Sequence, residues 1–183
     1  MKNLTNAVKA ASVFSAKNDV RYYFNGVTLY MSGGDVNSIV STDSHVCAII
    51  GDFGLKGVPV VIDNKDVDTL CNALLASDDV ELGDGVLIVG AYHIPVVDCR
   101  FPDIKRLIPN KSRTPCELVG IKIDYMAKLK PFKNQLYKHL PAKEKSCLSA
   151  KMSVGGETDV ITLTFSGEEI TPAIVLISPM RLQ

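Results

Sequence analysis

The chain has 183 residues, which is enough for one domain or two small ones. Its apolar content of 46% and its formal net charge of zero argue against intrinsic disorder. No apolar run reaches membrane-spanning length, and the N-terminal MKNLTNAVKA lacks a signal-peptide core. The five cysteines are scattered, without a CxxC motif, which favours a reducing cytosol over a disulfide framework or a zinc site. We therefore expect a cytoplasmic protein with no membrane segment, metal or other cofactor.

The neutral total hides an uneven distribution of charge. Residues 1–110 carry nine Lys/Arg and thirteen Asp/Glu, whereas residues 111–183 carry eleven and seven. From Lys122 to Lys151, eight lysines stand against Asp124 and Glu144. A lysine-rich face of this kind indicates nucleic-acid binding, and the alternative is a solvated helix face and loop.

The N-terminal region reads as one helix followed by strands. Helical spacing of apolar residues predicts a helix over residues 3–16. Apolar runs then predict strands over residues 20–24, 27–31, 36–40 and 45–50. The sequence Ser32-Gly33-Gly34-Asp35 predicts the hairpin turn, and Gly26 is expected as a bulge or bend.

Two further regions repeat this order. A strand at 58–62 precedes a helix that Asp63 or Asn64 caps and that runs to Ala76, with Val67, Leu70, Leu74 and Leu75 on one face. Later strands are predicted at 80–82, 86–91 and 94–97, and then at 118–123, 146–154, 159–165 and 173–178, with a short helix at 125–129 ended by Pro131. The pattern of one helix and about three strands occurs near 1–54, 58–100 and 118–180, which predicts an α+β fold with helices on one face of antiparallel sheets.

The stretch Phe101–Pro109, FPDIKRLIP, is called the strap here. Its two prolines exclude a helix interior or a central strand, yet Phe101, Ile104, Leu107 and Ile108 need cover. We expect an ordered connector on a protein surface, with Lys105 and Arg106 facing water or a partner. A plain connector between domains is the alternative.

Motifs for catalysis are absent from the sequence. It has no GxxxxGK[ST] loop and no GxGxxG after a strand. His45 and Cys47 form an HxC pair without a second ligand pair, so packing is the preferred role. Asp43, Ser44 and His45 are adjacent on a strand and cannot form a catalytic relay. We therefore expect that the protein is not an enzyme.

Four stretches together carry a family resemblance: Asn18–Gly26 (NDVRYYFNG), Ser41–Ala48 (STDSHVCA), the strap, and Ile177–Leu182 (ISPMRL). In type, order and spacing they resemble the bacterial DNA polymerase III beta subunit, the sliding clamp. The resemblance implies the DNA-clamp fold, in which helix-plus-strand units repeat.

The resemblance also implies a domain division. Residues 1–109 resemble the whole middle clamp domain, and residues 110–183 resemble a half-size last domain, matched from residue 115. The first domain is expected to be missing, so a ring cannot close in the usual way, and a phage or mobile-element version is expected.

The family binds a short linear motif of its partners in a pocket between these two domains. Carried over by position, the peptide-binding pocket would be lined by His45, Val46, Cys47, Pro102, Arg106, Leu107, Leu176, Ser178, Pro179 and Met180. Val46, Cys47 and Ser178 stand where the family has arginine, leucine and methionine. Apolar walls with a flexible methionine suit a peptide with leucine or aromatic anchors.

The family contacts DNA through its helices and the loop before its tyrosine pair. The resemblance and the lysine pattern together predict DNA-binding residues, namely Lys9, Lys17, Asn18, Arg21, Tyr22, Tyr23, Lys128, Lys130 and Lys133; Lys2 is a further candidate. For Tyr22 and Tyr23 the alternative is one buried and one exposed strand residue.

The implied function is a non-catalytic, sliding-clamp-like replication factor. Its expected partners are duplex DNA bound without sequence specificity, a DNA polymerase, the clamp loader or other proteins with a clamp-binding motif, and further copies of itself. The alternative is a clamp-like interaction protein, a competitor or inhibitor of the host replication machinery, that keeps the peptide pocket but does not encircle DNA.

Overall fold

The computed structural model describes residues 3–109, 119–156, 159–167 and 170–180. Its α-helices are α1 (Leu4–Ala11), α2 (Val67–Ala76), α3 (Ile123–Leu136) and α4 (Ala142–Cys147). Short 3₁₀ helices are η1 (Ser12–Phe14), η2 (Tyr22–Phe24), η3 (Asn64–Asp66) and η4 (Ile104–Leu107). The strands are β1 (Gly26–Ser32), β2 (Asp35–Thr42), β3 (Val46–Gly51), β4 (Val58–Asp63), β5 (Val80–Leu82), β6 (Val86–Val89), β7 (Tyr92–Pro95), β8 (Lys151–Ser153), β9 (Ile161–Phe165) and β10 (Ala173–Ile177).

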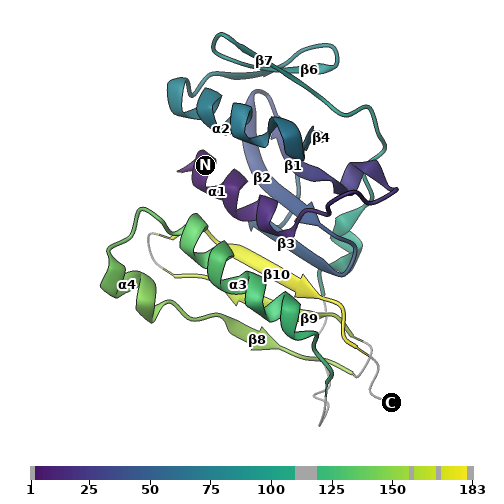
Figure 1. The fold of residues 1–183 in the computed structure, drawn as a ribbon, viewed down its shortest axis with the longest axis vertical. Helices are drawn as coiled ribbons and strands as arrows, with labels where there is room; N and C mark the ends of the chain where they lie inside the picture. Colours follow the sequence, from purple (N-terminus) through teal and green to yellow (C-terminus); the bar gives the residue numbers. More distant parts are fainter. Residues whose placement is uncertain (1–2, 110–118, 157–158, 168–169, 181–183) are drawn as a thin grey trace.

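Two antiparallel sheets organise these elements. The larger sheet has seven strands in the order β4-β1-β2-β3-β10-β9-β8, and the smaller has the order β5-β6-β7. Helices α1 and α3 contact each other over one face of the larger sheet, and α2 lies beside α1 toward the smaller sheet (Figure 1). The predicted α+β fold, with helices on one face, is confirmed. Within the described residues, no helix is long and apolar enough to cross a membrane.

The pairing of β3 with β10 joins distant parts of the chain into this one sheet. Leu176 lies opposite Cys47 and Ile177 lies opposite Val46 in an antiparallel register. The sheet therefore runs without interruption across the predicted division at residue 109.

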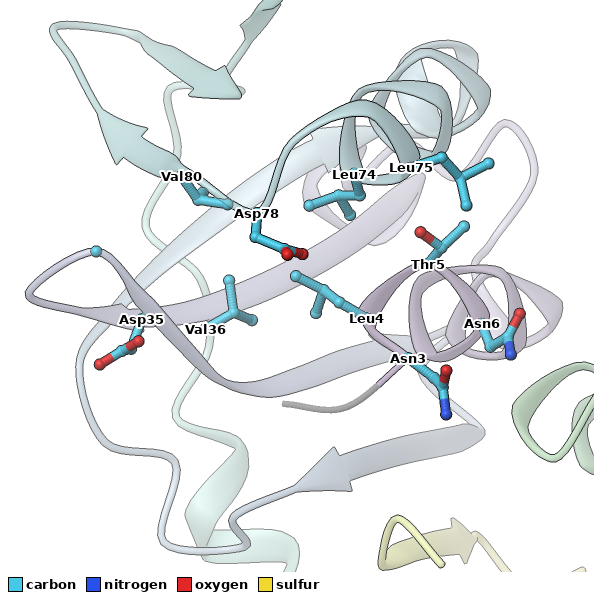
Figure 2. Close-up of a pocket in the computed structure, with 11 residues that line it drawn as sticks. Asn3, Leu4, Thr5, Asn6, Asp35, Val36, Leu74, Leu75, Asp78 and Val80 are labelled. Carbon is cyan, nitrogen blue, oxygen red and sulfur yellow. The ribbon is translucent and has the colours of Figure 1, made fainter. Parts of the chain in front are cut away.

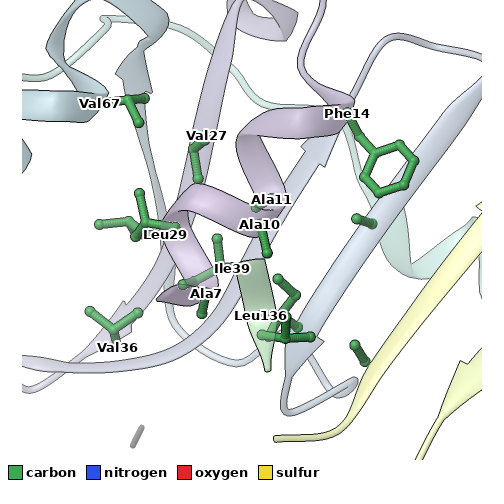
Figure 3. Close-up of a cluster of buried hydrophobic side chains, with 14 of the residues drawn as sticks. Ala7, Ala10, Ala11, Phe14, Val27, Leu29, Val36, Ile39, Val67 and Leu136 are labelled. Carbon is green, nitrogen blue, oxygen red and sulfur yellow. The ribbon is translucent and has the colours of Figure 1, made fainter. Parts of the chain in front are cut away.

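The main core lies between the larger sheet and its helices. Small residues on α1, Ala7, Ala10 and Ala11, are fully buried beside Leu136 of α3 (Figure 3). The Phe132 ring packs edge-on against Phe14 at 5.3 Å and against Phe165 at 5.6 Å between centroids. Since α1 presents only methyl groups over much of its buried face, the helix lies close to the strands and to α3.

The opposite face of the larger sheet is covered by the strap. Strand alternation sends Cys47, Ile49 and Leu176 to this face, where they cluster with Phe101 and Ile104 of the strap. Lys105 and Arg106 are exposed, as expected. The strap is thus an ordered segment that packs on the sheet through Phe101 and Ile104, with Ile108 partly buried against the same cluster.

In the N-terminal region, the predicted hairpin is confirmed, with the turn at Gly33-Gly34 in the left-handed region (φ 59° and 88°). The strand predicted at 20–24 is wrong, because this segment contains η2 instead. The Asn25 side chain accepts from the Asp19 N–H and donates to the Asp19 carbonyl, both at 2.8 Å. These local hydrogen bonds pair the backbone N–H and carbonyl of Asp19, so these two groups do not need a partner on a neighbouring strand. Gly26 begins β1, where a side chain would meet the Ile62 carbonyl.

Three predictions in the C-terminal region are also wrong. The helix predicted at 125–129 runs on past Pro131 as α3, and burial of Phe132 and Leu136 on the sheet compensates for the lost backbone bond. Of the strand predicted at 118–123, the described part shows one bridge, Gly120 to Met180. The strand predicted at 146–154 divides into the end of α4 and the short β8.

One prediction for α2 is also wrong. Leu75 was expected on the buried face of this helix, but its side chain is 73% exposed.

Candidate functional site

The residues predicted for the peptide pocket come from the ends of β3 and β10 and from the strap. The Ser178 N–H donates to the His45 carbonyl at 2.8 Å, which extends the β3–β10 pairing by one bond. The Met180 N–H donates to the Gly120 carbonyl at 2.8 Å, so the segment after β10 is held as well. The fold therefore brings three stretches that lie far apart in the sequence to one corner.

The floor of this corner is apolar and closed. Cys47 and Leu176 are 3% and 2% exposed and belong to the cluster that Phe101 and Ile104 cover. Burial raises the pKa of the Cys47 thiol to about 12, so this group stays protonated and serves as a small apolar side chain. Within the described residues, no group of three or more metal-binding side chains occurs.

Several side chains predicted to line the pocket are exposed or half-buried. Leu107 is 43% exposed and Met180 is 50% exposed, while Pro102, Ser178 and Pro179 are half-buried. Exposed apolar groups beside a closed apolar floor are suited to anchor side chains of a peptide.

Three predicted lining residues behave differently from the others. The His45 ring stacks on Tyr125 of α3 and lines a cavity on the helix side of the sheet, so its side chain does not lie on the strap face. Val46 points to the helix face and is buried in the main core, so its side chain does not share a face with Cys47. This corrects the assignment of the Val46 side chain to the pocket. Arg106 is exposed and pairs with Asp103 of the strap at 3.1 Å.

Some of the predicted DNA-binding residues gather around one cavity on the helix side of the sheet. Tyr23 instead packs against the strap-face cluster, and the Tyr22 hydroxyl donates to the Asp98 carbonyl at 3.3 Å. A cavity of about 720 Å³ opens between the loop after η1, the turn before β3 and the start of α3. Lys17, Asn18, Arg21 and Lys128 line it. The remaining predicted residues lie outside its wall: Lys9, Tyr22, Tyr23, Lys130 and Lys133. Lys2 lies outside the described residues.

Arg21 is held by acceptors within its own loop and in the turn before β3. Its guanidinium donates to both Asp19 oxygens, at 3.0 and 2.8 Å, and to the Ser44 hydroxyl at 3.1 Å. It also stacks over the Phe24 ring at 4.7 Å. The hydrogen bonds from Arg21 lower the pKa of Asp19 to about 2, so this carboxylate stays charged.

Lys128 joins α3 to the turn before β3. Its ammonium donates to Asp43 Oδ2 at 2.9 Å, and the N–H groups of His45 and Val46 donate to Asp43 Oδ1 at 3.0 and 2.9 Å. Burial is the largest influence on Asp43 and would raise its pKa. The hydrogen bonds, first that of Lys128, outweigh burial, and the pKa is lowered.

Sequence reasoning missed Asp43 and Tyr125 as parts of this site. The His45 ring stacks on Tyr125 with centroids 6.1 Å apart and an interplanar angle of 16°, and the Lys122 ammonium lies 5.4 Å from the same ring. The signal for Asp43 is its position two residues before His45, where an Asp side chain caps a turn. The contact of Tyr125 with His45 has no local signal.

Most cations around this cavity are already paired. Arg21 pairs with Asp19, Lys128 pairs with Asp43, and Lys122 lies 3.6 Å from Asp124. Among the cavity's four Lys/Arg side chains in the described part of the chain, only Lys17 is outside an ion pair. The cavity is therefore only weakly positive, which limits its attraction for phosphate.

Comparison with known proteins gives beta sliding clamps both among the sequence relatives and among the structural neighbours. No protein-family model matches the chain. The beta sliding clamp of Pseudomonas aeruginosa is 31% identical over 121 residues, covering 58% of this chain and 32% of that protein. The beta sliding clamp of Escherichia coli K12 is 32% identical over 112 residues, covering 56% and 30%. The match thus spans about a third of the length of these curated relatives.

Solved structures extend the likeness to nearly the whole chain. The DNA polymerase III beta subunit of Pseudomonas aeruginosa superimposes with a TM-score of 0.69 at 16% identity, over 97% of this chain and 64% of that one. The Thermotoga maritima beta subunit gives a TM-score of 0.68 at 15% identity, over 98% and 64%. The resemblance predicted from four short motifs is confirmed: the chain is similar in sequence to the bacterial beta sliding clamps over more than half of its length, and it has their fold.

Proposed function

We propose that the chain is a non-catalytic, sliding-clamp-like replication factor of the cytoplasm. It binds clamp-binding motifs of a polymerase, a clamp loader or similar partners, associates with duplex DNA without sequence specificity, and self-associates. The likeness to beta sliding clamps supports the general function, and the meeting of β3, β10 and the strap at one corner is the observation that carries the peptide-binding part. The division into domains at residues 1–109 and 110–183 remains part of this proposal.

The peptide site is proposed at the rim formed by Leu107 and Met180 above the floor of Cys47 and Leu176. An extended peptide with one leucine and one phenylalanine would place its apolar anchors against these exposed groups. Replacement of Met180 by Glu would put a charge against an apolar anchor while leaving the backbone bond of Met180 to Gly120 in place.

The peptide proposal is tested with a fluorescent peptide that carries these two anchors. Met180→Glu should weaken binding by about tenfold or more, as measured by fluorescence anisotropy. Met152→Glu is the matched control, because Met152 is similarly exposed (56% against 50%) but lies on β8. Unchanged affinity for Met180→Glu, or an equal loss for both variants, would refute the site.

The DNA face is proposed on the helix side, where α1, the loop after it and α3 lie together. Because Arg21 and Lys128 are ion-paired, the exposed Lys17 and Lys130 are the better candidates for phosphate contact. Because few Lys and Arg side chains on this face are outside ion pairs, we expect weak, salt-sensitive binding of duplex DNA. Removal of one lysine–phosphate interaction should flatten the log–log salt dependence of the binding constant by about 0.9 units.

The DNA part is tested on a short duplex at low salt. The double variant Lys17→Ala, Lys130→Ala should bind more weakly and with a flatter salt slope. The variant Lys143→Ala, Lys145→Ala removes the same charge from α4 and should keep the slope of the parent. If the parent binds the peptide but no duplex, the chain is a clamp-like competitor that does not encircle DNA.

A further inference from the structure

A further cavity lies where α1 begins and α2 ends. A space of about 720 Å³ opens between these two helix ends, the β1–β2 turn and the start of β5 (Figure 2). Its apolar lining includes Leu4, Val36, Leu74 and Val80, and the last three are buried members of the main core. The apolar wall of this cavity is therefore held in place by close packing behind it.

The charged side chains that line this cavity have one sign. Asp35 and Asp78 line it, and its described lining residues include no Lys, Arg or His. Figure 2 shows Asp35 at the β1–β2 turn and the Asp78 carboxylate pointing toward Leu4. Neither carboxylate forms an ion pair with another described residue. This space, called the acidic cavity here, can therefore pair its carboxylates with the cations of a partner.

The region around the acidic cavity is also negative. Residues 58–98, which form β4, α2 and the smaller sheet, contain eight Asp/Glu and one lysine. In the cavity beside α3, by contrast, Asp19, Asp43 and Asp124 each have a Lys or Arg partner. Since a negative surface repels phosphates, the acidic cavity favours a basic protein segment over a nucleic acid.

Leu75 adds an exposed apolar group to the lining of the acidic cavity. Its side chain is 73% exposed, more than that of any other leucine in the described part of the chain. The sequence pattern of α2 predicts this residue on the buried face, yet no other part of the molecule covers it. An apolar side chain that stays in water beside an apolar cavity indicates a surface that a partner covers.

The loop that carries Asp78 is fixed on both sides. Before it, the Ser77 N–H donates to the Ala73 carbonyl at 2.9 Å. After it, the Asp79 N–H donates to the Ser77 hydroxyl at 3.1 Å, and the Gly90 N–H donates to the Asp79 carbonyl at 3.2 Å. Because the loop is already ordered, a partner that binds Asp78 has little loop entropy to overcome.

We propose that the acidic cavity binds a basic, leucine-containing segment of another protein. The leucine side chain enters between α1 and α2 against Leu4 and Leu75, and Lys or Arg side chains of the segment pair with Asp35 and Asp78. In an extended segment, residues two apart share a face, so these cations stand two residues before and two residues after the leucine.

This site is separate from the peptide site proposed above. The latter uses Leu107 of the strap and Met180, neither of which lines the acidic cavity. A partner with both kinds of segment could therefore bind the two sites at the same time. The inference does not depend on the proposed function.

The proposal is tested with a fluorescent peptide of sequence GKSLSKG at low salt. A peptide of this length forms no stable helix in water, so it represents an extended segment. It should bind the parent chain, as measured by fluorescence anisotropy. Replacement of its leucine by serine, or of both its lysines by glutamate, should weaken binding by about tenfold or more, because each change removes one of the two complementary features.

Matched variants of the chain locate the site. Asp78→Lys should weaken binding of this peptide by about tenfold or more, because it places like charges in contact. Asp84→Lys makes the same change at an exposed residue of the same acidic region outside the cavity, and its affinity should stay within about threefold of the parent value. Leu75→Ser should also weaken binding, whereas Leu82→Ser, at an exposed leucine of β5 outside the cavity, should not.

Several outcomes would overturn the site. Equal losses for Asp78→Lys and Asp84→Lys would mean that the lysines are attracted only by the overall negative charge. A parent chain that does not bind the peptide, or that binds its serine version equally well, would also refute the proposal. If Asp78→Lys keeps peptide binding but abolishes self-association in sedimentation velocity, the occupant is a second copy of this chain and the proposal is wrong.

The fold and the other peptide site serve as controls. The four substituted residues are exposed, so equal thermal unfolding of parent and variants is expected. The peptide with leucine and phenylalanine anchors should bind all four variants like the parent. Failure of the acidic cavity as a binding site is therefore distinct from failure of the proposed function.

Discussion

The two faces of the seven-stranded sheet have different kinds of cover. On the helix face, two packed helices bury Phe14, Phe132 and Phe165 almost completely. On the strap face, one segment contributes Phe101 and Ile104, and its Leu107 remains 43% exposed. A thickly covered face contributes mainly to stability, whereas a thinly covered face keeps apolar groups available to a partner. The difference predicts that mutations on the two faces separate loss of stability from loss of binding.

The largest effect is expected at Phe132 on the helix face. Phe132→Ala should lower the free energy of unfolding by about 3–5 kcal/mol, because the ring is fully buried between two other aromatic rings. Urea unfolding measures this loss, with Phe132→Leu as a control that keeps most of the volume and costs less. A loss below about 1 kcal/mol would mean that the helices are only loosely attached to the sheet.

A smaller loss is expected at Ile104 of the strap. Ile104→Ala should lower the free energy of unfolding by about 2 kcal/mol, near the low end for a buried isoleucine, since the thin cover can collapse onto the space. Ile104→Val, which removes one methylene, should cost about 0.5–1.5 kcal/mol. If Ile104→Ala proves as costly as Phe132→Ala in the same urea experiment, the two faces do not differ in the way described.

The ion pair of Asp43 with Lys128 should give a pH-dependent contribution. Asp43→Asn is expected to cost about 1–2 kcal/mol at pH 7, as loss of hydrogen bonds to a charged group. The pKa of Asp43 is lowered by folding, so its contribution is fully present above the unfolded value of about 3.9 and is lost as pH falls through the lower folded value. The stability difference between parent and variant should therefore shrink as the pH is lowered below about 4.

The control for this prediction is Asp124→Asn. The Asp124 side chain is 77% exposed and its distance to Lys122 is 3.6 Å, so only a small change in the free energy of unfolding is expected. A difference for Asp43→Asn that grows at acid pH would contradict the assigned direction of its pKa shift.

The smallest effect on stability is expected at Leu107, three residues after Ile104 on the same 3₁₀ helix. Leu107→Ser should change the free energy of unfolding by no more than about 0.5 kcal/mol, because the side chain is already largely in water. It should nevertheless weaken binding of the leucine- and phenylalanine-containing peptide. Thermal unfolding and fluorescence anisotropy on one preparation measure both quantities, and a large stability loss with intact binding would reverse the roles of the two faces.

Local patterns predicted much of the fold. The Gly33-Gly34 turn, the apolar runs of β1 to β3 and the cap of Asp63 on the helix after β4 depend on near neighbours, and each is present. The segment before Asn25 was misread as a strand, because its apolar letters gave no sign of the side-chain bonds that close it as a loop. Pro131 is a local signal for the end of a helix, but α3 continues through it because Phe132 and Leu136 are buried in the core.

The candidate sites were also predictable only in part, because short motifs do not specify tertiary contacts. The motif resemblance placed Leu107 and Met180 in one proposed pocket, but the faces on which the His45 and Val46 side chains lie follow from the three-dimensional arrangement and not from the motif. The ion pairs that occupy Arg21 and Lys128 join residues distant in sequence or set by loop geometry. Composition counted these side chains as available cations, and only the three-dimensional arrangement shows that carboxylates already bind them.

The pairing of β3 with β10 also sets an order of events while the chain is being made. β3 ends at Gly51 and β10 begins at Ala173, so roughly 120 residues separate the two partners. At a synthesis rate of about 5–20 residues per second, β3 waits roughly 6–24 s for the strand that completes its edge. During that interval the edge that includes Ile49 and Ile50 is open to pairing with other chains. In a crowded cell, slow translation of the C-terminal region would therefore favour aggregation of nascent chains, and a chaperone that covers β3 would counter it.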